Sequence, residues 1–177
     1  SVDCDQKIAI AIDESGHAYN VLFDTGATLS CFDSRLRNQM VQYDTTLGPA
    51  KHFWVNGVNG TTRESNQCYD VPIRFLMSNR SHVTVGVHLV AMDLSRLPHV
   101  DIILGLDTIV LYDITLSMRQ QLATWPYAST TIMGVAVDDP DVHTEHIRIP
   151  LHPASGLYQT YPGEPIHKLA PVIASND

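Results

Sequence analysis

One aspartate in this 177-residue chain stands in a context that favours chemistry. Asp24 follows the apolar run Val21-Leu22-Phe23, which is typical of a buried strand, and it precedes Thr25-Gly26-Ala27. A carboxylate at the end of a buried strand is costly unless hydrogen-bond donors surround it. Gly26 permits a tight turn whose backbone N–H can approach the carboxylate, and Thr25 can direct its hydroxyl into the same network. The segment therefore predicts either a reactive carboxylate or an aspartate that only caps a turn.

The elements that would position Asp24 are mostly short strands. Apolar and polar residues alternate with period two in several segments that turn residues separate, which is the pattern of half-buried strands. Two pairs of these segments follow each other closely enough to form hairpins. Helical patterns are confined to residues 34–40 and 107–112. The sequence therefore predicts an all-β barrel or sandwich, with strands over residues 7–12, 17–23, 71–77, 82–90 and 101–104.

The proline content divides the chain near residue 125. Seven of the ten prolines lie in residues 126–177, and each removes a backbone donor that a central strand needs. Residues 131–137 and 146–151 still have a strand-like pattern. We therefore predict one domain over residues 1–125 and a proline-rich C-terminal extension or linker over residues 126–177.

Charge and composition argue against several classes of function. The chain has 11 lysines and arginines and 19 aspartates and glutamates, a formal charge of −8, so we expect no nucleic-acid partner. No apolar run approaches the roughly 20 residues of a membrane span, so we expect no membrane association. The histidine pair in residues 143–146 lacks a third ligand, and no metal is expected there. We interpret the odd set of cysteines as reduced, which predicts a cytoplasmic protein: Cys4, Cys31 and Cys68.

Three motifs in a fixed order carry a resemblance to a known family. The first is residues 21–30, the second is Ile102-Ile103-Leu104-Gly105-Leu106-Asp107, and the third lies between them at residues 53–61. Together they resemble the Asp-Thr-Gly turn, the later apolar-Gly strand with its short helix, and the flap hairpin of retropepsin-like aspartic proteases. The resemblance covers roughly residues 5–120 and leaves out the tail. It implies an all-β retropepsin-like acid protease barrel with one short C-terminal helix.

The resemblance also implies a mechanism and an assembly. In this family two aspartates hold one water, and neighbouring carboxylates share a proton because both cannot be charged cheaply. This chain contains a single Asp-Thr-Gly, so two copies related by a two-fold axis would each supply Asp24. The implied catalytic residues are Asp24, Thr25 and Gly26, and Thr25 would reach across to the other subunit. The implied partners are a second copy and a polypeptide substrate such as its own polyprotein, and no cofactor is required.

The hairpin predicted over residues 53–61 would act as a lid over the substrate. Asn56-Gly57 and Asn59-Gly60 are strong turn pairs, because Asn and Gly tolerate positive φ. A lid excludes water during cleavage yet admits the substrate. An ordinary surface hairpin is the alternative. The implied substrate-binding residues are Ala27 and Thr28 beside the turn, and Trp54, Val55, Asn56, Gly57, Val58, Asn59 and Gly60 in the hairpin.

Two positions depart from the viral members of the family. Those members often have an acidic residue after Asp-Thr-Gly-Ala and an arginine after the later glycine, which pair near the dimer interface. Here the two positions hold Thr28 and Leu106, and the Leu-Gly-Leu-Asp form resembles retroelement and cellular members, including the DNA-damage-inducible group. We therefore predict a homodimeric aspartic endopeptidase of retroelement origin. The alternative is a domesticated fold with little or no turnover that binds peptides or mediates dimerisation.

Overall fold

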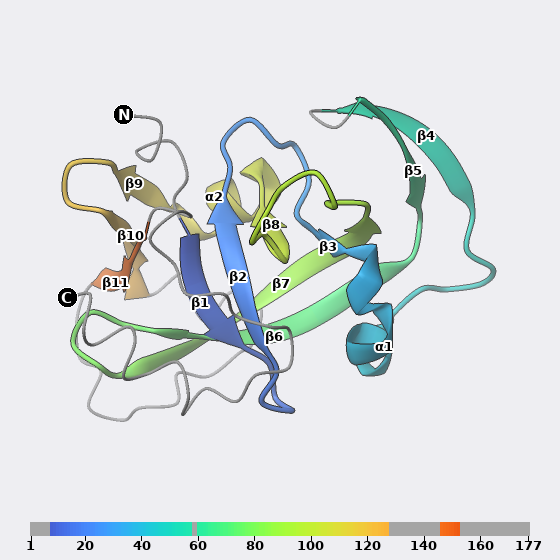
Figure 1. Ribbon diagram of the computed structural model, residues 1–177. Coiled ribbons are helices and arrows are strands. Elements are labelled where there is room, and N and C mark those ends of the chain that lie inside the picture. Colours follow the sequence, from blue (N-terminus) through green and yellow to red (C-terminus); the bar gives the residue numbers. More distant parts are fainter. Residues whose placement is uncertain (1–7, 58–59, 128–145, 153–177) are drawn as a thin grey trace.

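Six strands close a barrel in the order β1-β2-β8-β3-β7-β6 in the computed structural model, which describes residues 8–57, 60–127 and 146–152 (Figure 1). The all-β class predicted from the sequence is therefore confirmed. The barrel strands are β1 (Ile8–Ile12), β2 (Ala18–Phe23), β3 (Cys31–Asp33), β6 (Cys68–Leu76), β7 (His82–Met92) and β8 (Ile102–Leu104).

The two predicted hairpins are confirmed as the antiparallel pairs β1–β2 and β6–β7. Strand β1 is buried along its whole length, because both of its faces are covered. Its small side chains point to one face and its large side chains point to the other. Ala9 and Ala11 belong to the main core, while Ile10 and Ile12 pack with Ala18 in a separate cluster. The alternation of Ala and Ile in the sequence is thus the pattern of a strand with two buried faces.

Strand β8 brings together segments that are distant in the sequence. It runs parallel to β2, with Phe23 opposite Leu104, and antiparallel to β3, with Cys31 opposite Ile103. All three of its residues are buried. Because parallel strands end at the same edge of a sheet, the residues after β2 and β8 lie next to each other.

The helices are short and lie where the sequence predicts them. Two 3₁₀ turns, η2 (Ser34–Leu36) and η3 (Val41–Tyr43), flank α1 (Arg37–Met40), and α2 (Leu106–Tyr112) follows β8. The buried hydroxyl of Tyr112 donates a hydrogen bond to the carbonyl oxygen of Gly86 in β7. This bond fastens α2 to the barrel. No helix within the described ranges is long and apolar enough to cross a membrane.

Two smaller sheets complete the described structure. Strands β4 (His52–Gly57) and β5 (Gly60–Ser65) form a hairpin that projects from the barrel (Figure 1). Strands β9 (Thr115–Ser117), β10 (Leu122–Pro126) and β11 (His146–Pro150) form a three-stranded sheet with β10 in the middle.

Strand β11 comes from the predicted C-terminal extension, yet it packs in the main core. Ile147 and Ile149 are buried beside Trp125, and backbone hydrogen bonds join His152 to Ile8. The domain boundary near residue 125 stays a prediction, but residues 146–152 share one core with the barrel. The possible strand at residues 131–137 lies outside the described residues.

Candidate active site

Asp24 lies at the shared edge of the parallel strands β2 and β8. Its backbone N–H donates to the carbonyl oxygen of Leu104 at 3.0 Å, which extends the β2–β8 ladder by one residue. The residue is half-buried. A carboxylate that is fixed by its backbone yet open to solvent on one side can hold a water molecule and exchange a proton with it.

The turn after Asp24 turns back onto the carboxylate. The Gly26 N–H donates to Asp24 Oδ1 at 2.8 Å, and the Ala27 N–H donates to the Asp24 carbonyl at 3.2 Å. A Cβ at position 26 would lie 3.2 Å from the same carboxylate oxygen, which is closer than ordinary contact. Glycine is therefore the residue that lets the backbone N–H and the carboxylate approach, as the sequence predicts. Thr25 and Thr28 are exposed beside them.

The β8–α2 junction packs directly against this turn. The Leu106 N–H donates to the Ala27 carbonyl at 2.8 Å, and the Asp107 N–H donates to the Thr28 carbonyl at 3.2 Å. A Cβ on Gly105 would lie 2.7 Å from the carbonyl oxygens of both Ala27 and Leu29. Only glycine allows this contact between two backbones, so the glycine of the second motif has a steric role.

A polar cluster beneath the turn is the feature that the sequence did not reveal. The buried Ser30 hydroxyl donates to Asp107 Oδ1 at 2.6 Å, accepts the Gly105 N–H at 3.0 Å and lies 2.7 Å from Thr108 Oγ1. The Asp107 carboxylate also accepts the N–H groups of Ser30 and Thr108. These bonds tie the segment after Asp24 to the start of α2. The sequence did contain two signals for this cluster: the hydroxyl of Ser30, six residues after Asp24, and the acidic Asp107 in the first turn of α2.

The buried aspartates of the described residues do not add a second carboxylate to the Asp24 turn. The three buried aspartates of the described residues are engaged elsewhere: Asp13 with Tyr19 and His17, and Asp33 and Asp101 with Arg35. Asp107 faces Ser30. No three acidic, histidine or cysteine side chains in the described segments gather as a metal site would require.

The predicted site residues fall into two groups. Those from Asp24 to Thr28 share one turn, whereas Trp54, Val55, Asn56, Gly57 and Gly60 belong to the β4–β5 hairpin. Trp54 is 70% exposed, and Gly57 is opposite Gly60 at the far end of the hairpin. Val58 and Asn59 lie outside the described residues. The hairpin is therefore confirmed, and its role over the turn stays a prediction.

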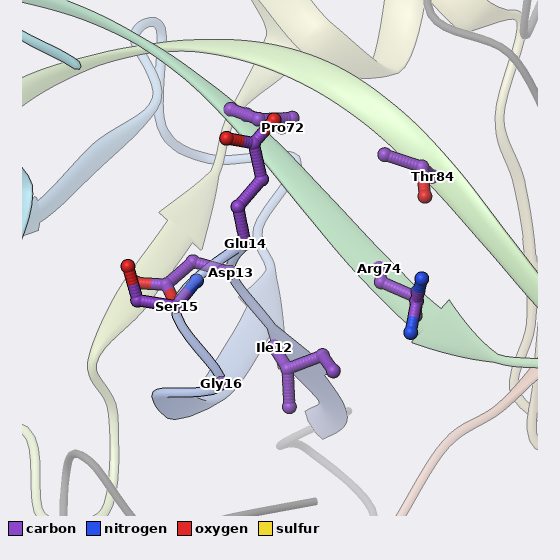
Figure 2. Close-up of a pocket in the computed structure, with 8 residues that line it drawn as sticks. All are labelled: Ile12, Asp13, Glu14, Ser15, Gly16, Pro72, Arg74 and Thr84. Carbon is purple, nitrogen blue, oxygen red and sulfur yellow. The ribbon is translucent and has the colours of Figure 1, made fainter. Parts of the chain in front are cut away.

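A pocket in the described part of the barrel is lined by residues other than those of the Asp24 turn. A cavity of about 360 Å³ opens between the β1–β2 turn and strands β6 and β7 (Figure 2). Asp13 at its wall accepts the hydroxyl of Tyr19 at 2.7 Å and the N–H groups of Ser15 and His17. Burial is the main cause that raises the pKa of Tyr19, and the hydrogen bond to Asp13 is the second cause. The Tyr19 hydroxyl therefore remains a donor. These bonds hold the β1–β2 turn in shape. They account for the burial of the Asp13 carboxylate by a structural role in this turn.

The geometry around Asp24 matches what the sequence motifs imply: an Asp-Thr-Gly turn beside an apolar-Gly strand, with a short helix after that strand. No protein-family model and no curated protein matches the chain. Among solved structures, the chain is similar to the crystal structure of the retroviral protease-like domain of Ddi1 from Leishmania major. The two are 12% identical with a TM-score of 0.48, and the match covers 86% of this chain and 95% of that one.

Proposed function

We propose that this protein is an aspartic endopeptidase of retropepsin type that is active as a homodimer. The observation that supports it best is the setting of Asp24: a half-buried carboxylate at the end of two parallel strands, with one oxygen bound by the Gly26 N–H. The backbone of Gly105 packs against the segment after Asp24, and the hydrogen bonds of the Ser30 cluster tie this segment to the start of α2.

The reaction needs two such carboxylates. Asp24 of one protomer removes a proton from the bound water, and the water oxygen attacks the peptide carbonyl carbon. The protonated Asp24 of the partner protomer gives its proton to the carbonyl oxygen. The C–N bond then breaks, and the amine leaves with the proton that the first Asp24 took from water. A hydroxyl of the intermediate returns its proton to the partner's Asp24 as the carbonyl re-forms, which restores the dyad. The substrate is an extended peptide, paired like a strand with the turn and the β4–β5 hairpin.

The decisive experiment replaces one carboxylate oxygen at the site. Asp24→Asn is expected to lower cleavage of a peptide library on the order of 1,000-fold or more between about pH 3.5 and about pH 7, because amides cannot transfer the proton. The matched control is Asp70→Asn, since Asp70 lies exposed on β6 and pairs with the exposed His88. Circular dichroism and sedimentation should show both variants folded and assembled like the wild type. Undiminished cleavage by Asp24→Asn would remove this residue from the mechanism.

The second candidate is a peptide-binding or dimerisation module without turnover. It is favoured by the absence of the viral ion pair, since uncharged Thr28 and Leu106 lie beside the turn instead. The same library separates the two functions. A module would bind extended peptides with unchanged affinity in wild type and Asp24→Asn, and neither would cleave them.

A further inference from the structure

Strand β1 is paired by two different segments along the edge that does not face β2. It pairs with β6 at Ala11 and Ile12, at the end of β1 that lies away from the Asp24 turn. At the other end, the Ile8 N–H donates to the His152 carbonyl oxygen at 3.0 Å, and the His152 N–H donates to the Ile8 carbonyl oxygen at 2.9 Å. A residue of the predicted C-terminal extension thus covers the edge of β1 near the candidate active site.

The segment that makes this pairing is anchored at further points. The side chains of Ile147 and Ile149 are buried in the main core. The Arg148 carbonyl oxygen accepts the N–H of Ser78, in the turn between β6 and β7, at 3.0 Å. Residues 146–152 therefore bridge the start of β1 and the β6–β7 turn, and we refer to them as the closing segment.

Ile8 begins a row of residues that lie opposite one another in four neighbouring strands. Ile8 is opposite Leu22, Leu22 is opposite Ile103, and Ile103 is opposite Cys31. Such residues project their side chains to the same face of a sheet. All four belong to one apolar cluster or pack against it. The row therefore crosses β1, β2, β8 and β3 as one packed unit, and the backbone of His152 holds its first member.

The row is in contact with the Asp24 turn. Leu22 precedes Asp24 by two residues in the chain, and Ala27 of the turn packs against the same apolar cluster. Ile8 directs both of its backbone groups to His152, so its pair with Leu22 is of the kind in which the side chains lie closest. Because packed side chains leave little free space, a shift of Ile8 displaces its neighbours in the row.

We infer that the closing segment positions Asp24 for catalysis, and that the backbone pairing of His152 with Ile8 is the contact through which it does so. The inference rests on the proposed protease function and adds that the catalytic unit extends to residue 152. His152 is a positioning residue here, since it acts through the row and not on the substrate. A small displacement of a reacting group costs much of the rate, because the chemical step needs a defined geometry.

The test removes one backbone donor from the full 177-residue chain. His152→Pro lacks the N–H that donates to Ile8. Pro153 follows this position in the sequence and already favours an extended backbone there, which suits proline. His152→Ala keeps the N–H and removes the imidazole with its contacts, so it separates the backbone from the side chain.

Ser78→Pro is the matched control, because it removes the donor that binds the closing segment at Arg148 instead. The Arg80 N–H donates to the Met77 carbonyl oxygen at 3.0 Å, so Ser78 is the second residue of a four-residue turn. Proline is favoured at this position of a turn. The two proline variants each lose one backbone hydrogen bond of the same segment, and urea unfolding should show a similar loss of stability for both.

For His152→Pro we expect kcat to fall on the order of 10-fold, with KM within about threefold of the wild type, because the chemical step is impaired and peptide binding is not. Hydrogen exchange gives a readout that needs no activity. The Ala27 N–H, which donates to the Asp24 carbonyl oxygen, should exchange on the order of 10-fold faster, since exchange reports local opening. His152→Ala and Ser78→Pro should stay within about threefold of the wild type in both measurements.

Ile8→Val is a milder second variant. It shortens one side chain of the row by a methylene group and keeps the pairing with His152. We expect the Ala27 N–H to exchange about 2–5-fold faster in this variant. If His152→Pro does not fold, this measurement decides the proposal.

The other outcomes overturn the proposal in distinguishable ways. If kcat and exchange are unchanged in His152→Pro, or change equally in Ser78→Pro, the closing segment only supports the fold. If His152→Ala reproduces the loss, the imidazole is responsible and the backbone pairing is not. A wild-type chain that cleaves no peptide rejects the proposed function, and the exchange rates of Ala27 then decide separately whether the closing segment holds the turn.

Discussion

Replacing Ser30 by alanine should destabilise the whole domain, because one hydroxyl serves three partners in a place that water does not reach. Ser30 is 1% exposed, and its Oγ contacts the Gly105 N–H, the Asp107 carboxylate and the Thr108 hydroxyl. The alanine variant leaves the Gly105 N–H without this acceptor and removes one of the donors to Asp107. A buried group that loses its hydrogen-bond partner costs about 1–3 kcal/mol.

The expected loss of unfolding free energy is about 2–4 kcal/mol. Asp107 keeps the N–H groups of Ser30 and Thr108 as donors, so the loss of the Ser30 hydroxyl costs little free energy at Asp107. The Gly105 N–H loses its acceptor, and this loss makes the larger contribution. For a chain of this length the loss corresponds to a fall in Tm of about 5–15 °C. It is a large fraction of a total stability of about 5–15 kcal/mol.

Urea unfolding followed by tryptophan fluorescence measures this loss, because Trp125 is buried in the core and reports its exposure to water. Ser78→Ala is the matched control, since the Ser78 side chain is exposed in the turn between β6 and β7. A change of less than about 0.5 kcal/mol for Ser30→Ala, equal to that of the control, would refute the claim that the cluster holds the Asp24 turn.

Two further predictions follow from contacts at the two ends of β8, at Gly105 after the strand and at Asp101 before it. Gly105→Ala should lower the unfolding free energy by about 1–3 kcal/mol, because the new Cβ would lie 2.7 Å from two backbone carbonyl oxygens; unchanged urea midpoints would show that the turn can move aside. Burial raises the pKa of Asp101 despite its bonds to Asn20 and Arg35, so the folded state binds the proton more tightly than the unfolded state. Its contribution to stability is therefore full below the ordinary aspartate pKa and is lost as pH rises through the raised pKa. Asp101→Asn should remove that slope from the pH dependence of the unfolding free energy, and parallel curves for variant and wild type would contradict the assignment.

Much of the local structure follows from the sequence alone. Residues of two kinds alternate along the segments that form the hairpins β1–β2 and β6–β7. This alternation predicts strands, because successive side chains of a strand point to opposite faces of the sheet. The Asp-Thr-Gly motif predicts that the Gly26 N–H approaches the carboxylate, since both groups lie within three residues. These interactions depend on neighbours along the chain, and the sequence contains all the information they need.

Tertiary structure decided how the distant segments meet. Ser30 and Asp107 are 77 residues apart, and nothing in either segment specifies that β8 lies between β2 and β3. Likewise, the proline-rich region predicts an extension, yet Ile147 and Ile149 from β11 pack in the main core. Local pattern determines that a side chain must be buried, but the partner that buries it depends on the packing of all strands at once. For this reason the Asp-Thr-Gly turn could be predicted from the sequence, and the cluster that holds the turn could be found only in the folded barrel.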